Sequence, residues 1–397
     1  MHRSKSPLLV IFLTIFLDLL GFGLVIPLLP FFASDLGATG FQVGIVMTAY
    51  SGMQFLCAPL WGRLSDRIGR RPVLLVSIAG NVVAMLLFAA STNLVVFFLA
   101  RAFAGMANAN IGTAQAYIAD ITPPEQRTKG MGLIGAAFGL GFVLGPAVGG
   151  LLAGISHAAP ALAAAGLSAL NLVLAFFILP ESLKPEAREA AKLRRGSRLQ
   201  AFRESLSHPF LPLLFLLFFL TTVGFAQLET TFALFTAKRF GYDVTQNGYL
   251  FAFIGVVLAL VQGGIVHPLR RWAGEAAMLL VGTVGLMIGL LVIGQVHTSS
   301  GLVAACAILA FGNGLSSPAL SSLVSKQAPS HSQGRILGVN QSMGSLARVI
   351  GPLVGGFTFD HGGEVAPFFV AAGILGVAVL ISLRIFRSRE RAQTAAA

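Results

Sequence analysis

The chain has 397 residues, of which 55% are hydrophobic and only 11% are charged, and it contains 46 glycines besides. Soluble domains are about 45–50% apolar and about 25% charged, so this composition disfavours a water-soluble enzyme. The 27 Lys and Arg residues against 15 Asp and Glu residues give a net charge of +12, which in a soluble chain would indicate nucleic-acid binding.

Twelve hydrophobic runs of about 20 residues follow one another along the chain, each long enough to cross a hydrocarbon core of about 30 Å. The first is too long for the apolar part of a signal peptide, so we expect a retained helix. The sequence therefore predicts an all-α integral membrane protein with twelve transmembrane helices. The runs cover residues 8–32, 41–61, 73–90, 94–119, 129–155, 158–179, 210–236, 246–266, 276–296, 301–324, 336–359 and 365–386.

One long polar stretch, residues 181–208, divides the runs into six and six. We interpret it as a cytoplasmic linker between two six-helix bundles, residues 1–180 and 209–397. A shift of 206 positions lays Gly145–Gly150 on Gly351–Gly356, so the halves are pseudo-symmetric copies. Parallel six-helix repeats are a transporter plan with the substrate site between the halves, whereas a channel has no need of the duplication.

The positive charge is distributed unevenly between the two sides of the predicted helices. The termini and the loops on their side hold 23 of the 27 Lys and Arg residues, and the opposite loops hold only Lys238 and Arg239. This asymmetry is the positive-inside rule, and it predicts cytoplasmic termini in an inner or plasma membrane. The basic composition thus reports topology, and we exclude nucleic acid as a partner.

Four charges remain inside the predicted helices: Asp18, Arg101, Glu229 and Arg348. A charge at the centre of a membrane helix costs at least about 2.5–3.5 kcal/mol, so such residues are candidates for function, although two buried structural ion pairs are the alternative. A membrane acid that binds a proton in one conformation is the simplest coupling device. We expect Asp18 to be that acid and Arg101 to tune its charge.

Polar side chains recur at helical spacing and predict a wet central cavity. In the fourth helix they lie on one face, because their steps alternate between four and three residues. Any single one of them would equally well bond a neighbouring helix. The fourth-helix stripe consists of Arg101, Gly105, Asn108, Gly112 and Gln115, and further expected cavity residues are Tyr50, Gln54, Phe138, Phe142, Glu229, Asn313, Gln341 and Arg348.

Glycines recur every four residues in the fifth helix, at Gly141, Gly145 and Gly149, with Pro146 and Gly150 beside them. Small residues at this spacing let another helix approach closely. We favour tight packing at a moving interface over direct ligand contact.

The segment Gly62–Pro72, with sequence GRLSDRIGRRP, resembles the loop signature of the major facilitator superfamily. The fourth helix carries a similar arginine motif at Leu99–Gly105, and Gly141–Gly150 resembles the motif of its twelve-helix drug:proton antiporters. The stretch Ala116–Thr122 is similar to the corresponding stretch of tetracycline efflux proteins.

The resemblance implies a conformational latch on the cytoplasmic side, in which Arg70 pairs with Asp120 and Asp66 meets a helix of the other half. We expect the glycines of this segment to permit tight turns, although the arginines here would also act as topology anchors alone. The latch residues are Gly62, Asp66, Arg67, Gly69, Arg70 and Asp120.

The sequence departs from the tetracycline exporters, because residues 73–90 and 276–296 contain no acid where those proteins carry one. Arg348 leaves room for an anionic or zwitterionic substrate instead. We expect a proton-coupled antiporter that exports a small amphipathic or drug-like molecule, with uptake symport as the alternative.

An integral-membrane enzyme or a channel is disfavoured by the absence of a catalytic motif and by the repeat. The two cysteines, Cys57 and Cys306, lack the spacing of a metal site. We expect no catalytic residue, metal or cofactor, a proton gradient as the energy source, and a monomer in contact with membrane lipid.

Overall fold

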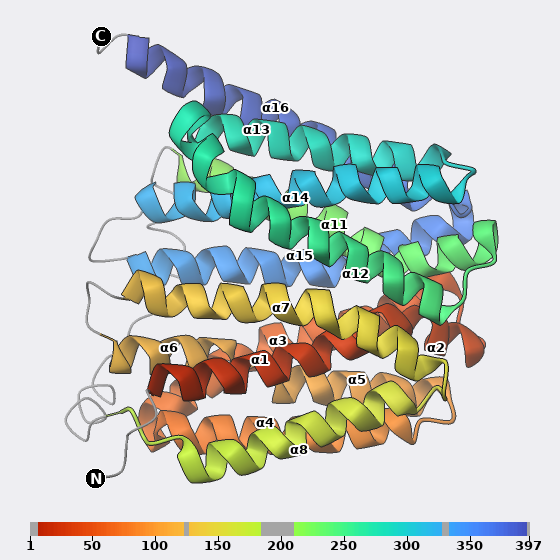
Figure 1. Cartoon of the computed structure of the whole chain (residues 1–397), viewed down its shortest axis with the longest axis vertical. Coiled ribbons are helices and arrows are strands. Elements are labelled where there is room, and N and C mark those ends of the chain that lie inside the picture. Colours follow the sequence, from red (N-terminus) through yellow and green to blue (C-terminus); the bar gives the residue numbers. More distant parts are fainter. Residues whose placement is uncertain (1–6, 123–126, 184–209, 328–332, 395–397) are drawn as a thin grey trace. The chain divides into compact units, whose positions relative to one another are not determined.

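The computed structural model describes residues 7–122, 127–183, 210–327 and 333–394, and within these ranges the chain forms helices and no strand (Figure 1). The first part contains α1 (Pro7–Val25), η1 (Ile26–Leu28), α2 (Leu29–Asp35), α3 (Gly40–Ile68), α4 (Arg70–Ala89), α5 (Leu94–Ala107), α6 (Ile111–Ile121), α7 (Arg127–Ala153) and α8 (Ala159–Ile178). The second contains α11 (Leu211–Phe240), α12 (Val244–Leu260), η3 (Val261–Ile265), α13 (Val266–Gln295), α14 (Ser299–Gln327), α15 (Gln333–Gly362) and α16 (Ala366–Thr394).

Every predicted hydrophobic run lies on one, two or three consecutive helical elements. Among the described residues, nine helical stretches are long and apolar enough to cross a membrane. Large apolar side chains such as Leu56, Phe177 and Leu380 are between 63% and 79% exposed. Exposure of this extent is unusual for a soluble protein and suits a surface that meets lipid, so the chain is a multi-pass membrane protein.

The chain divides into two compact units. Unit 1 consists of Met1–Ala38, Ile45–Arg195 and Asp243–Ala252, and unit 2 consists of Thr39–Gly44, Gly196–Tyr242 and Phe253–Ala397. In unit 1, α1 packs against α7 and α8, and α4 packs against α5 and α8 (Figure 1). In unit 2, α13 lies beside α14 and α16, and α11 lies beside α15 and α16.

The fourth predicted run is broken into α5 and α6 at residues 108–110, where we expected one continuous helix. Side chains of neighbouring helices bond the carbonyls at the break. Ser77 Oγ donates to Ala107 O at 2.6 Å, and Gln54 Nε2 donates to Asn108 O at 3.1 Å. These bonds satisfy two backbone carbonyls at the break. A backbone carbonyl left without a hydrogen bond costs several kcal/mol in a membrane.

The segment expected as a loop, Gly62–Pro72, is almost entirely helical. α3 runs on to Ile68 and α4 begins at Arg70, so only Gly69 separates them. The hydrophobic run ends at Trp61, while the helix extends beyond it into charged sequence. Gly69 has φ +114°, a conformation that favours glycine. The turn expected at Gly62 is wrong, because Gly62 lies inside α3 with a negative φ.

Candidate functional site

A hydrogen-bonded carboxyl in α1 forms the first part of the candidate site. Asp18 Oδ1 accepts a hydrogen bond from Asn171 Nδ2 of α8 at 2.9 Å. The same amide nitrogen donates to Thr14 O at 3.0 Å, one turn earlier in α1. Asn171 is 1% exposed, so a membrane carboxyl is held by a fixed amide and not by a mobile surface group.

Close packing of α7 on α1 places this carboxyl. A Cβ at Gly145 would lie 2.6 Å from the Cα of Gly23, and one at Gly149 would lie 2.9 Å from the carbonyl carbon of Leu24. The four-residue glycine spacing therefore lets two helix backbones meet, as small-residue seams do. Farther along α7, Gly150 O accepts a bond from Thr245 Oγ1 at 3.0 Å. A Cβ at Gly248 would lie 2.8 Å from Pro146 O, so this motif is occupied by helix packing.

The buried arginine of α5 lies over an aromatic ring. The guanidinium carbon of Arg101 is 4.6 Å from the ring centre of Tyr50 in α3, and Arg101 is 3% exposed. Gly105, one turn later, brings α5 against α3, because a Cβ there would lie 2.7 Å from the carbonyl carbon of Tyr50. A cation over a ring in a site without bulk water gains about 2 kcal/mol or more.

Tyr50 also connects the arginine to the neighbourhood of the acid. Its ring centre lies 5.2 Å from that of Phe22, which follows Asp18 by one helical turn on α1. Within the described residues no ion pair joins Asp18 to Arg101. Of the two charges that the sequence suggested as partners, Arg101 thus lies over the ring of Tyr50 and Asp18 is bonded to Asn171.

A chain of amide hydrogen bonds crosses unit 1 at the break between α5 and α6. Asn108 Nδ2 donates to Asn81 Oδ1 at 2.8 Å, and Asn81 Nδ2 donates to Ser168 Oγ at 2.8 Å. Gln54 joins this chain through Asn108 O, so two of the expected cavity residues are brought together. Gln115, by contrast, is exposed. The side chains of Phe138 and Phe142 lie outside the described residues.

Unit 2 holds the other two membrane charges. Glu229 of α11 and Arg348 of α15 are both partly buried, and no ion pair within 4 Å joins them in the described part of the chain. Asn313 is partly buried in α14, and Gln341 is exposed on α15. Sequence reasoning missed Gln227, which precedes Glu229 by two residues. Gln227 is fully buried, and neither of its amide atoms is bonded to a residue that the structure describes.

A charged cluster lies where α3 and α6 end and α4 begins, and we call it the latch. Arg70 Nε donates to Asp120 Oδ2 at 3.2 Å, the pair that the family resemblance implies. Arg70 also forms an ion pair with Asp66 and donates to Ser65 Oγ at 2.8 Å. Arg67 is exposed.

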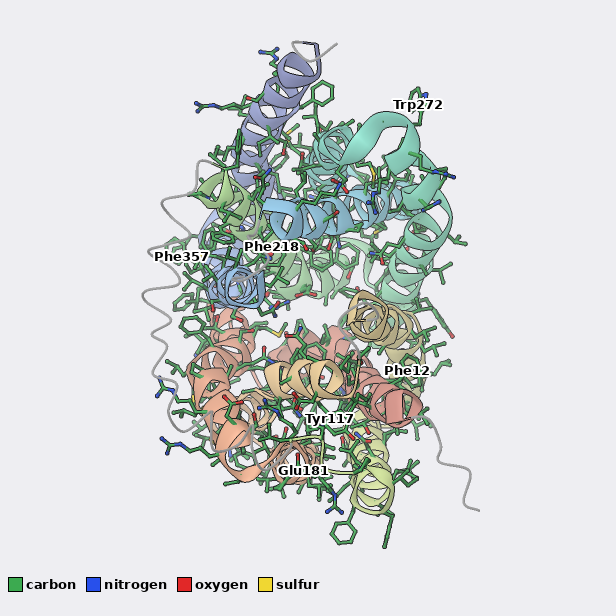
Figure 2. All side chains as sticks on the ribbon, turned by 90° about the vertical axis from the view of Figure 1, so that its left-hand side faces the viewer. Phe12, Tyr117, Glu181, Phe218, Trp272 and Phe357 are labelled. Carbon is green, nitrogen blue, oxygen red and sulfur yellow. The ribbon has the colours of Figure 1, made fainter. Side chains whose placement is uncertain are left out.

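Sequence reasoning missed Glu181, which completes the latch. Its Oε1 accepts from the backbone nitrogen of Arg70 at 2.9 Å, and its Oε2 accepts from that of Arg71 at 3.2 Å. A carboxylate at the start of α4 meets the positive end of that helix. Tyr117 Oη donates to Pro180 O at 3.0 Å, and Figure 2 shows Tyr117 and Glu181 in the same part of unit 1.

Unit 2 contains a similar cluster with its charges exchanged, which the sequence reasoning also missed. Glu275 accepts from Lys326 Nζ and from Ser322 Oγ, both at 2.7 Å, and pairs with Arg270 at 3.2 Å. It follows Gly274, whose φ is +77°, as Arg70 follows Gly69. The repeat shift of 206 places Asp120 on Lys326, which is the signal that would have found it. The nearby Trp272 projects from the surface (Figure 2).

Comparison with known proteins gives a consistent result. The Major Facilitator Superfamily profile matches residues 11–352 and 274–397. The class C tetracycline resistance protein of Escherichia coli is 35% identical over 355 residues, which are 89% of either chain. The human major facilitator superfamily domain-containing protein 10 is 32% identical and covers 92% of this chain, with 90% of its own length matched.

Solved structures show the same fold. The crystal structure of the human organic anion transporter MFSD10 (TETRAN) superposes with a TM-score of 0.72 at 30% identity and covers 96% of this chain and 100% of that one. The nucleoside transporter NupG has a TM-score of 0.80 at 16% identity, with 96% and 100% covered.

Proposed function

Since this chain belongs to the major facilitator superfamily and is a membrane transporter, we propose that it is a proton-coupled antiporter that exports a small amphipathic, drug-like molecule by alternating access. The observation that carries the proposal is the membrane carboxyl of Asp18, hydrogen-bonded to Asn171 in place of a cation. The relatives with tetracycline and multidrug resistance names support the export direction.

Asp18 is suited to gain and lose a proton during a transport cycle. The Asp18 carboxyl accepts a hydrogen bond from a neutral amide, that of Asn171. Among the described residues, no cation lies within 4 Å of this carboxyl. Protonation therefore breaks no ion pair, unlike protonation of Asp120 in the latch. Each proton that enters supplies about 2.3 kcal/mol per 100 mV of membrane potential, in addition to its pH gradient.

The charges inside the helices favour a substrate that carries negative charge. Arg101 and Arg348 are cations in membrane helices, and α4 contains no acid between residues 73 and 89. The relative described as an organic anion transporter supports the same class. We propose an anionic or zwitterionic amphiphile, with Glu229 and Arg348 presenting opposite charges to it.

The protein lies in an inner membrane with both termini in the cytoplasm. The uneven distribution of Lys and Arg between the two sides of the helices supports this orientation. Coupling to the proton gradient requires no cofactor, and the chain contains both repeats of the transporter plan, which supports function as a monomer surrounded by lipid.

The direction of gradient-driven accumulation in proteoliposomes tests this proposal. A radiolabelled amphipathic organic anion and tetracycline serve as separate tracers, with imposed pH gradients of either sign. Antiport predicts that an acidic lumen drives accumulation of a tracer, because protons that leave exchange for substrate that enters. Accumulation only with an acidic exterior would indicate uptake symport and overturn the proposal. Empty liposomes with the same gradients give the passive background.

A further inference from the structure

Asn171 of α8 is a buried amide whose nitrogen and oxygen differ in their bonding. Its amide nitrogen donates two hydrogen bonds, to Asp18 Oδ1 and to Thr14 O. Its amide oxygen is buried and bonds to no atom of the described residues. A buried acceptor left unbonded costs about 1–3 kcal/mol. We therefore expect a hydrogen-bond donor to reach this oxygen in another state of the transport cycle.

An amide can serve both states of a neighbouring carboxyl. Its N–H donates to an ionised carboxylate, and its oxygen accepts from the O–H of a carboxylic acid. Asp18 offers that O–H only when it is protonated. The donor and the empty acceptor of Asn171 therefore match the two protonation states of Asp18.

We infer that Asn171 is a positioning residue for the proton site: it orients the Asp18 carboxylate through Nδ2 and offers its free Oδ1 to the protonated acid. The inference rests on the proposed function, in which Asp18 exchanges a proton. It assigns to α8 a role in coupling that the polar pattern of the sequence did not reveal.

The surroundings of Asp18 leave few other groups to set its proton affinity. α8 and η1, both packed on α1, contain no ionisable side chain. α7 contributes charges only at its start, where side chains lie outside the described residues. The ionisable groups of α6 and α7, the other elements packed on α1, are Tyr117, Asp120, Arg127 and Lys129. Tyr50 of α3 contacts Phe22 of α1, and Arg101 lies over the ring of Tyr50.

The carboxyl can be followed directly by infrared difference spectroscopy of the purified full-length protein titrated with acid. The band of the protonated Asp18 is identified by its absence in Asp18→Asn. In Asn171→Leu, the carboxylate loses a bond to a charged group, which is stronger than the neutral bond that the protonated acid loses, so the titration midpoint is expected to rise by about one pH unit. Asn171→Ala removes the same amide and serves if the leucine variant does not fold. Asn171→Gln retains the amide and is expected to return the midpoint toward the wild-type value.

Asn81→Leu is the matched control, because Asn81 is also buried in unit 1 and makes two side-chain bonds, but not to Asp18. It is expected to lower thermal stability and to leave the midpoint in place. An unchanged midpoint in Asn171→Leu or Asn171→Ala would overturn the inference, as would an equal shift in Asn81→Leu. Failure of the proposed function is separate, since it is read from gradient-driven accumulation by the wild type.

Discussion

Gly105 is predicted to be indispensable for placing Arg101. In Gly105→Ala the new Cβ would lie 2.7 Å from the carbonyl carbon and 2.8 Å from the Cα of Tyr50, both backbone atoms. An ordinary contact begins at 3.4 Å, so α5 and α3 must separate by at least 0.7 Å. Such overpacking costs about 1–3 kcal/mol, and the same displacement weakens the stacking of Arg101 on Tyr50, 4.6 Å apart.

The assay combines thermal unfolding of the purified protein with tracer counterflow in proteoliposomes. Gly112→Ala is the matched control, because Gly112 lies two turns farther on the same predicted face and a Cβ there meets nothing within 4 Å. Gly105→Ala is expected to unfold at a lower temperature and to lose most of its counterflow, while Gly112→Ala keeps both. Equal stability and transport in the two variants would refute the packing argument.

Two further predictions concern the charged ends of the helices. Gly69→Ala is expected to lose about 1–3 kcal/mol of stability because φ there is +114°, whereas Gly62→Ala, inside α3 and in open space, should be neutral in the same thermal unfolding assay. Glu275→Lys and Lys326→Glu are each expected to destabilise the protein, and the double exchange to recover part of the loss, with a coupling of about 0.5–3 kcal/mol in a double-mutant cycle. Additive effects of the two single exchanges on the free energy of unfolding would show that the Glu275–Lys326 pair contributes nothing to stability.

The length of the hydrophobic runs predicted the helices well, because the thickness of a bilayer sets the length of the helix that crosses it. The break between α5 and α6 could not be predicted, since the bonds that satisfy it come from Ser77 and Gln54 on other helices. The ends of the helices also escaped prediction. α3 extends past its hydrophobic run and α4 begins before its own, in charged sequence where composition no longer marks a helix.

The candidate site was predicted as a set of residues but not as a set of contacts. Periodicity shows that Arg101 and Gly105 share a face, but not that this face meets Tyr50. Asp18 stands out as a charge in an apolar run, whereas Asn171 and Glu181 are ordinary polar residues whose bonds arise from tertiary packing. Such partners become visible only when distant segments are brought together.

Asp18→Asn in proteoliposomes tests the central claim most directly, because the amide is isosteric with the carboxyl and cannot take up a proton. Two readouts of the same preparation are compared: accumulation driven by an acidic lumen, and counterflow without a gradient. We predict that Asp18→Asn retains counterflow and loses gradient-driven accumulation. Accumulation equal to that of the wild type would contradict the claim that the proton on Asp18 drives export.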